Sequence, residues 1–182
     1  NLRKGLGVYL TPDPVVQMVV DVLRPQPGSR ILDPAAGTGS FLLHTLFSWR
    51  AQGVDWELGD EPLLWGVERN PRILRVAALN LGPIVGEGFV RWPGDSLSPF
   101  YTAGSGESTP AWFAPESFDC IMTNPPFGVK VPGRVLASGA FTVAPATADH
   151  GRIGSEVLFL ERCLDLLRPG GKLAAVVPNS VI

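Results

Sequence analysis

Three observations predict an α/β protein with a doubly wound, mainly parallel sheet. Short apolar runs alternate with longer segments whose apolar residues recur at helical spacing. A helix between successive strands implies parallel pairing through right-handed crossovers. A turn that contains Gly37 and Gly39 separates the first apolar run from the helix that follows it. The 182 residues are enough for one domain with its own core, so we predict a single domain over residues 1–182.

The first predicted element is a helix over residues 11–25. Asp13 is expected to be its N-cap and Pro14 its first helical residue, because proline is favoured at that position. Pro25 is expected to end the helix, since it cannot continue the backbone hydrogen bonds. Residues 29–51 then predict a strand, the glycine turn and a second helix.

The same alternation continues to the end of the chain. Residues 63–82 predict a strand, a turn and a helix that stops at Gly82. Residues 88–97 and 118–128 each contain a short apolar run that predicts a strand. Residues 155–178 predict a helix, a Pro-Gly-Gly turn and a fifth strand.

Loops and the last residues bear on how complete the sheet is. The segments 97–117 and 128–154 are long and weakly patterned, and loops of that length inside a compact domain are usually functional. The chain stops at residues 178–182, directly after the fifth strand, which would leave a sheet edge exposed. We therefore expect a sheet truncated after the fifth strand, in a piece of a longer protein or in a subunit that docks.

The composition restricts the class of partner. The chain is 45% hydrophobic and 18% charged, as in ordinary globular proteins, and no apolar run reaches the roughly 18 residues of a membrane span. We expect no membrane partner. The net charge is -2, from 15 basic and 17 acidic residues, whereas a self-sufficient DNA-binding domain usually carries a basic excess. Any nucleic acid must therefore be held mostly by something outside this chain.

The cysteines and histidines argue against disulfide and metal chemistry. Cys120 and Cys163 each lie in an apolar segment, which predicts reduced core thiols in a cytoplasmic protein. No Cys-x-x-Cys or Cys/His pattern suggests zinc, and His44 and His150 are the only histidines. We predict no metal site.

The glycine turn predicts a ligand site at the carboxyl ends of the strands. The dinucleotide pattern Gly-x-Gly-x-x-Gly is incomplete, because Leu42 stands where the third glycine would be. Asp33 ends the strand before the turn, and its carboxylate would repel a pyrophosphate and attract a cation. A ligand with an adenosine end and a positively charged end suits this turn, and S-adenosylmethionine has both. Glu68 and Asp95 end the next two strands, so three acidic residues are expected to converge on one crevice.

Four stretches of the sequence resemble N6-adenine DNA methyltransferases of the gamma class, and most of all the modification subunits of type I restriction–modification systems. GVYLTP resembles the family's N-terminal motif, DPAAGTGSFL its cofactor motif and NPPF its catalytic motif. LRPGGKLAAVVPNSVI resembles the strand after the catalytic helix. The likeness spans nearly the whole chain. It implies the Rossmann-like catalytic domain of S-adenosylmethionine-dependent methyltransferases, and methyl transfer to the N6 amino group of adenine in DNA within a restriction–modification or related defence system.

The resemblance also implies roles for individual residues. The methionine side of the cofactor is assigned to the N-terminal motif, the ribose to Glu68, and the cofactor adenine to Asp95 with Leu97 beside it. The implied cofactor-binding residues are Tyr9, Thr11, Pro12, Asp33, Pro34, Ala35, Gly37, Thr38, Gly39, Phe41, Glu68, Arg69, Asp95, Ser96, Leu97 and Asn124. The implied active-site loop consists of Asn124, Pro125, Pro126 and Phe127.

The loop residues suit chemistry on a planar amino group. The lone pair of such an amine is delocalised, and two acceptors on its N–H bonds would pull it toward a tetrahedral shape. Asn124 offers its side-chain carbonyl and Pro125 its backbone carbonyl, held rigid by two consecutive prolines. Phe127 would stack on a target base turned out of the duplex. The same loop chemistry serves protein glutamine amides and RNA guanines, and an inactive cofactor-binding subunit is a further alternative.

The resemblance also implies a partner. The gap between Leu97 and Phe118 is too short for a target-recognition domain, and the helical N-terminal domain of type I subunits is absent. We therefore expect the recognition domain, or a specificity subunit, to lie outside residues 1–182.

Overall fold

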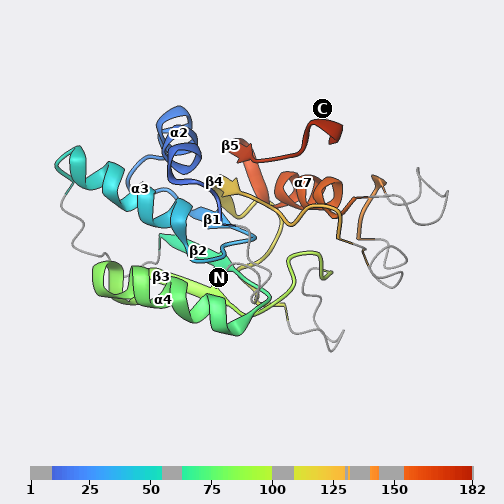
Figure 1. Ribbon diagram of the computed structural model, residues 1–182, viewed down its shortest axis with the longest axis horizontal. Coiled ribbons are helices and arrows are strands. Elements are labelled where there is room, and N and C mark those ends of the chain that lie inside the picture. The colour runs from blue at the N-terminus through green and yellow to red at the C-terminus, as the bar shows by residue number, and fades with distance from the viewer. Residues whose placement is uncertain are drawn as a thin grey trace.

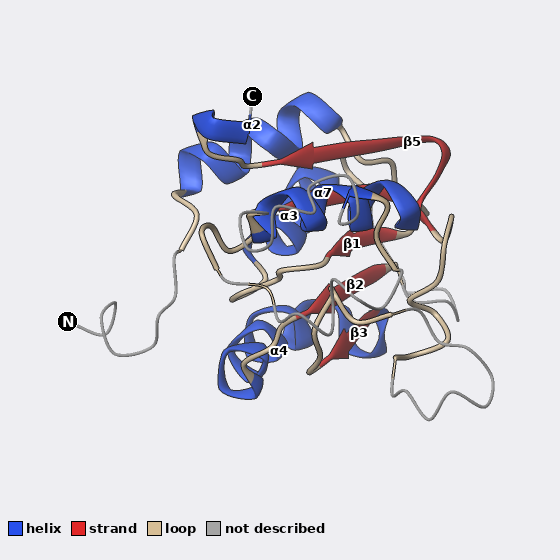
Figure 2. Cartoon of the chain, turned by 90° about the vertical axis from the view of Figure 1, so that its right-hand side faces the viewer, coloured by secondary structure: helices blue, strands red, loops and turns tan. Residues whose placement is uncertain are grey.

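Five parallel strands form one sheet within the part of the chain that the computed structural model describes, which is residues 10–54, 63–99, 109–129, 131, 140–143 and 154–181. The strand order is β3-β2-β1-β4-β5, and every neighbouring pair is parallel. Their bounds are Ile31–Asp33 for β1, Leu64–Val67 for β2, Phe89–Trp92 for β3, Phe118–Thr123 for β4 and Leu167–Ala175 for β5. From β1 the chain adds β2 and β3 toward one edge of the sheet, and it then adds β4 and β5 toward the other edge. This change of direction confirms the predicted doubly wound α/β fold. Figure 2 shows β3 and β5 at opposite edges of the sheet.

Helices cover both faces of the sheet (Figure 1). The main helices are α2 (Asp13–Leu23), α3 (Ser40–Ala51), α4 (Pro71–Val85) and α7 (Ser155–Leu166). The first three pack on one face, in a core that includes Ile31 and Met122 from the strands. α7 packs on the other face, where Cys163 and Leu166 meet Leu32. Successive strand residues point to opposite faces, so even the short strand β1 contributes to both cores.

Three local predictions are wrong, and each error has a physical reason. Asp13 lies inside α2 and Pro12 occupies the N-cap, because the Pro12 carbonyl accepts the first hydrogen bonds of the helix, from the Val15 and Val16 amides. α4 continues past Gly82 to Val85, because Val85 is buried in the core and that burial favours one more turn even with Pro83 inside the helix. The Pro-Gly-Gly segment belongs to β5, where a register shift bulges the strand and Gly170 adopts a φ of +79°.

The prediction that both cysteines are free thiols in the core is confirmed. Cys120 and Cys163 are free and buried, one in β4 and one in α7. Burial raises the pKa of the Cys120 thiol to about 12, so it stays protonated at neutral pH. None of the helices in the described ranges is long and apolar enough to cross a membrane.

Candidate active site

A cavity of about 470 Å³ opens where the strands end at their carboxyl side. Its walls come from the segments that follow β1, β2, β3 and β4, together with the start and middle of α7. The lining residues are Pro34, Ala35, Gly37, Val67, Glu68, Arg69, Ile73, Gly94, Asp95, Ser96, Leu97, Asn124, Pro125, Pro126, Phe127, Val129, Val131, Ser155 and Phe159. Its volume lies within the range typical of small-molecule sites, about 300–1,000 Å³.

The glycine turn after β1 packs tightly against α4. Gly39 adopts a φ of +82°, and a Cβ there would lie 3.1 Å from Leu81 and 3.3 Å from Ala77. Glycine is therefore required both for the backbone conformation and for the close approach of the turn to the helix. This contact fixes where the turn presents its backbone to the cavity.

Glu68 joins that turn to the end of β2. Its Oε2 accepts a hydrogen bond from the Gly37 amide at 3.1 Å, and its Oε1 accepts one from the Asn70 amide at 2.7 Å. A carboxylate has about four lone-pair sites, so roughly two remain for hydroxyl groups of a ligand. Glu68 lines the cavity in a fixed orientation that suits a vicinal diol.

The segment after β3 is pinned to the glycine turn. Asp95 Oδ1 accepts a hydrogen bond from the Leu97 amide at 3.0 Å, and its Oδ2 lies 3.8 Å from Arg69 Nε. The Ser96 hydroxyl donates to the Pro34 carbonyl at 2.6 Å. Leu97 is buried and gives this end of the cavity an apolar wall beside a carboxylate acceptor. An apolar wall next to a hydrogen-bond acceptor suits a flat heteroaromatic ring with an amino group.

Asp33 lies behind the cavity lining and is only 2% exposed. Burial raises the pKa of its carboxyl group to about 7, while the hydrogen bond from the Ala35 amide lowers it and the charge of Glu68 raises it. The ionisation of Asp33 therefore responds to small changes near neutral pH. A cation placed in the adjacent cavity would favour the carboxylate form.

Asn124 follows β4, and its amide is held from one side. Nδ2 donates a hydrogen bond to the Thr11 hydroxyl at 3.0 Å. Oδ1 is buried and accepts no hydrogen bond from any described residue. The carbonyl of Pro125 likewise takes part in no hydrogen bond within the described ranges. Two neighbouring acceptors are thus left without donors, next to the Phe127 ring, which is 44% exposed.

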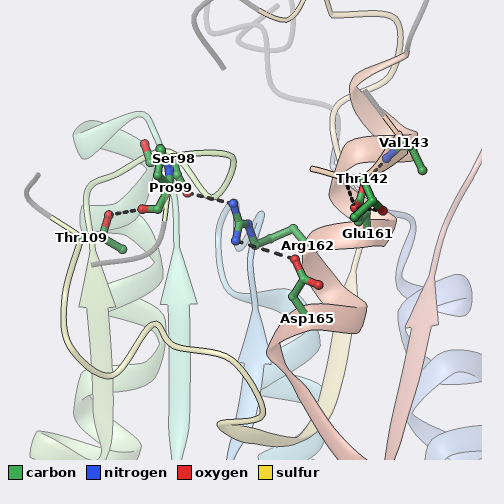
Figure 3. Close-up of polar contacts among 8 residues, drawn as sticks. All are labelled: Ser98, Pro99, Thr109, Thr142, Val143, Glu161, Arg162 and Asp165. Atoms are coloured by element: carbon green, nitrogen blue, oxygen red, sulfur yellow. Dashed lines mark hydrogen bonds and ion pairs between the residues drawn. The ribbon is translucent and has the colours of Figure 1, made fainter. Parts of the chain in front are cut away.

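α7 supports the far wall of the cavity. Figure 3 shows Arg162 reaching from this helix to the carbonyl of Ser98, a hydrogen bond of 3.0 Å. The guanidinium also lies 4.7 Å from the centre of the Phe141 ring, and the carboxylate of Glu161 accepts hydrogen bonds from Thr142. Leu97, Phe141, Leu158 and Phe159 form one small apolar cluster under the cavity. The helix therefore ties together two segments that are distant in sequence.

The structure brings most of the predicted site residues to this cavity. Twelve of them line it: Pro34, Ala35, Gly37, Glu68, Arg69, Asp95, Ser96, Leu97, Asn124, Pro125, Pro126 and Phe127. Thr11 contacts Asn124, whereas Asp33, Thr38 and Gly39 are not among the lining residues and Phe41, in α3, is buried in the core. Pro12 is the exposed N-cap of α2. Tyr9 lies outside the described residues.

Seven lining residues were not predicted. They are Val67, Ile73, Gly94, Val129, Val131, Ser155 and Phe159. Val67 and Gly94 are neighbours of predicted residues, so the position of a strand end could have indicated them. Ser155 and Phe159 lie on α7, and only the order of strands in the sheet brings that helix to the cavity.

Among the described residues, no group of three or more His, Cys, Asp or Glu side chains could hold a metal ion.

Comparisons with known proteins identify the family. The profile of the family described as N-6 DNA Methylase matches residues 1–182. A type I restriction enzyme StySPI methylase subunit from Salmonella potsdam is 31% identical, over 99% of this chain and 33% of the relative. The EcoKI methylase subunit from Escherichia coli K12 is 30% identical with the same coverage. The chain spans about a third of the length of these curated relatives.

Solved structures agree with the sequence comparison. A modification subunit of a putative type I restriction enzyme from Vibrio vulnificus YJ016 superposes with a TM-score of 0.71 at 26% identity, over 98% of this chain and 37% of that one. A putative class I S-adenosylmethionine-dependent methyltransferase from Listeria monocytogenes shares the fold, with a TM-score of 0.67 over 99% of this chain and 51% of that one. By its sequence over residues 1–182 and by its fold, this chain belongs to the N-6 DNA methylase family.

Proposed function

We propose that residues 1–182 form the catalytic domain of an adenine-specific DNA methyltransferase that uses S-adenosylmethionine. The observation that carries the proposal is the pair of acceptors without donors, the Asn124 side-chain oxygen and the Pro125 carbonyl, at one end of the cavity. The membership of the N-6 DNA methylase family and the relatives named as type I methylase subunits support it.

The described residues fit S-adenosylmethionine. Glu68 presents a fixed carboxylate with free acceptor sites to the ribose hydroxyls, and Asp95 with Leu97 offers an acceptor and an apolar wall to the adenine. Asp33 gives the cavity a source of negative charge that a sulfonium or ammonium group would stabilise. When bound, this cofactor supplies the methyl group as an electrophile on its sulfonium centre.

Asn124 and Pro125 would act on the amino group of the target. The Oδ1 atom accepts no hydrogen bond from any described residue, so an arriving N–H donor has no protein donor to displace from it. Accepting both N–H groups of an exocyclic amine favours a tetrahedral nitrogen whose lone pair is available for attack. The hydrogen bond from Nδ2 to the Thr11 hydroxyl fixes the amide orientation, so that Oδ1 rather than Nδ2 is the end offered to the target.

The target base would reach the site by leaving its stack. Phe127 exposes nearly half of its surface beside the acceptors, and stacking on an aromatic ring is worth about 1–3 kcal/mol per base. The net charge of -2 gives the chain little electrostatic attraction for DNA. We infer that a target-recognition domain or a specificity subunit outside these residues holds the duplex, in a restriction–modification complex that acts on cytoplasmic DNA.

Transfer of tritiated methyl groups from labelled S-adenosylmethionine to separate DNA, RNA and protein pools tests the proposal. We expect label in DNA, released on digestion as N6-methyladenine, and no transfer by the Asn124→Ala variant of the native protein. Label found in protein glutamine or in RNA guanine would show that this group, and not adenine in DNA, is the substrate. Binding of the cofactor without transfer to any pool would indicate an inactive binding subunit.

A further inference from the structure

The backbone on both sides of Phe127 is held by the first two residues of α7. The Ser155 hydroxyl donates a hydrogen bond to the carbonyl of Pro126 at 2.7 Å. The Gly128 amide donates one to Glu156 Oε2 at 3.2 Å. These contacts join segments 29 and 28 residues apart in the sequence. The residues immediately before and after the aromatic ring are thereby fixed to one helix.

Both side chains are withdrawn from solvent and supported locally. Ser155 is 1% exposed and Glu156 is 8% exposed. The carboxylate lies in the first turn of α7, where the helix dipole favours negative charge. A Cβ on Gly154 would lie 2.2 Å from Glu156 Oε1, so a larger residue there would force the carboxylate to move from the position it occupies beside the loop. Gly154, Ser155 and Glu156 are therefore arranged so that the last two side chains reach the loop.

The loop needs such support from outside. Pro125 and Pro126 have no backbone N–H, so the loop has few donors with which to stabilise itself. Phe127 is half exposed and its ring carries no polar group, so its position depends on the backbone that bears it. Among the described residues, Ser155 and Glu156 supply the side-chain hydrogen bonds that hold this backbone.

We propose that Ser155 and Glu156 are positioning residues that hold the active-site loop, and with it Phe127, in the orientation that receives the target base. This inference rests on the proposed function of the loop. It predicts that the two side chains matter for the methyl-transfer step and the entry of the base, and little for the binding of S-adenosylmethionine, whose proposed contacts lie at β1, β2 and β3.

Substitutions in the native protein separate this role from general stability. Glu156→Ala removes the acceptor for the Gly128 amide, whereas Glu156→Gln keeps an acceptor of the same length without the charge. We expect kcat to fall about tenfold in Glu156→Ala and in Ser155→Ala, the effect of losing one hydrogen bond, with the Kd of S-adenosylmethionine within twofold of the wild type by calorimetry. Glu156→Gln should retain most of the activity.

Ser117→Ala is the matched control, because the Ser117 hydroxyl also donates to a proline carbonyl, that of Pro115, at 3.3 Å but away from the cavity. It should leave kcat unchanged. If the wild type methylates DNA and both Glu156→Ala and Ser155→Ala have the same kcat as the wild type, the positioning role is overturned and the proposed function is left intact. A weakening of cofactor binding in proportion to kcat would overturn it as well.

Amide hydrogen exchange of the ligand-free protein keeps the two proposals distinguishable. The peptide that contains Gly128 should exchange faster in Glu156→Ala than in the wild type or in Glu156→Gln. This readout does not depend on any substrate, so it tests the contact even if no methyl transfer to DNA occurs. Equal exchange in all three proteins would show that Glu156 does not hold the loop.

Discussion

The buried carboxyl group of Asp33 makes a pH-dependent prediction for both stability and ligand binding. Its pKa lies near 7 in the folded protein and at its usual value of 3.8 when unfolded. Between these values the folded state holds a proton that the unfolded state has released. Unfolding free energy therefore decreases as the pH rises through this range, and the contribution of the protonated group is fully present below pH 4.

The magnitude follows from the size of that difference. A gap of about three pKa units, at about 1.36 kcal/mol each, corresponds to about 4 kcal/mol of stability lost between pH 4 and pH 7. Asp33→Asn removes the ionisation and keeps a side-chain oxygen for the Ala35 amide, which donates to Oδ1 at 3.0 Å in the wild type. The stability of the variant relative to the wild type should therefore increase across this range, by at most about 4 kcal/mol.

Urea unfolding of both proteins in a series of buffers from pH 4.5 to pH 8 measures this difference. Calorimetric titration with S-adenosylmethionine over pH 6 to 8 measures the second consequence, because a bound cation favours the ionised carboxyl group. Affinity for the wild type should rise about tenfold over that range, and affinity for Asp33→Asn should be lower at pH 8 and nearly independent of pH. Parallel stability curves for the two proteins, or pH-independent binding by the wild type, would refute this account of Asp33.

The remaining predictions concern three other contacts. Thr11→Val leaves the Asn124 amide without its partner and should lower kcat about tenfold, the effect of one lost hydrogen bond; Thr11→Ser should retain activity, and equal activity of all three proteins in the methyl-transfer assay would contradict a role in positioning. Asn124→Ala should lower kcat at least about 100-fold, as removal of a preorganised polar group does, with cofactor binding by calorimetry nearly intact; normal methylation would exclude this loop as the site. Arg162→Met should reduce the unfolding free energy by about 1.5–3 kcal/mol, since it leaves the Ser98 carbonyl without its charged donor; urea denaturation that matches the wild type would contradict this.

The sequence predicted the order of elements well, because apolar periodicity and turn residues are local properties. Helix ends were less predictable, since they depend on what the last turn packs against. Gly82 is a good stop signal in isolation, yet α4 continues because Val85 reaches the core. The N-cap of α2 shows the same limit, as Asp13 has the right chemistry and the chain enters the helix one residue earlier.

Some residues of the candidate site could be predicted from local sequence, whereas others could not. Residues at strand ends, such as Glu68 and Asp95, could be predicted because parallel strands bring their carboxyl ends to one edge. The contact between Thr11 and Asn124 joins residues 113 positions apart, and no local pattern encodes it. Ser155 reaches the loop after β4 only because α7 packs on the face of the sheet next to that strand. Contacts of this kind require the fold to be known first.

Three features in or directly behind the cavity lining oppose stability in the ligand-free protein. Asp33 is a buried carboxyl group, the Asn124 side-chain oxygen is a buried acceptor without a donor, and Phe127 exposes an aromatic ring to water. An unsatisfied buried acceptor alone costs about 1–3 kcal/mol. Under the proposed function each cost is relieved by a different part of the reacting complex, namely the cofactor's positive charge, the amino group of the base and the face of the base. Because a fold selected for stability alone would replace all three residues, their coincidence at one cavity is itself an argument for catalysis there.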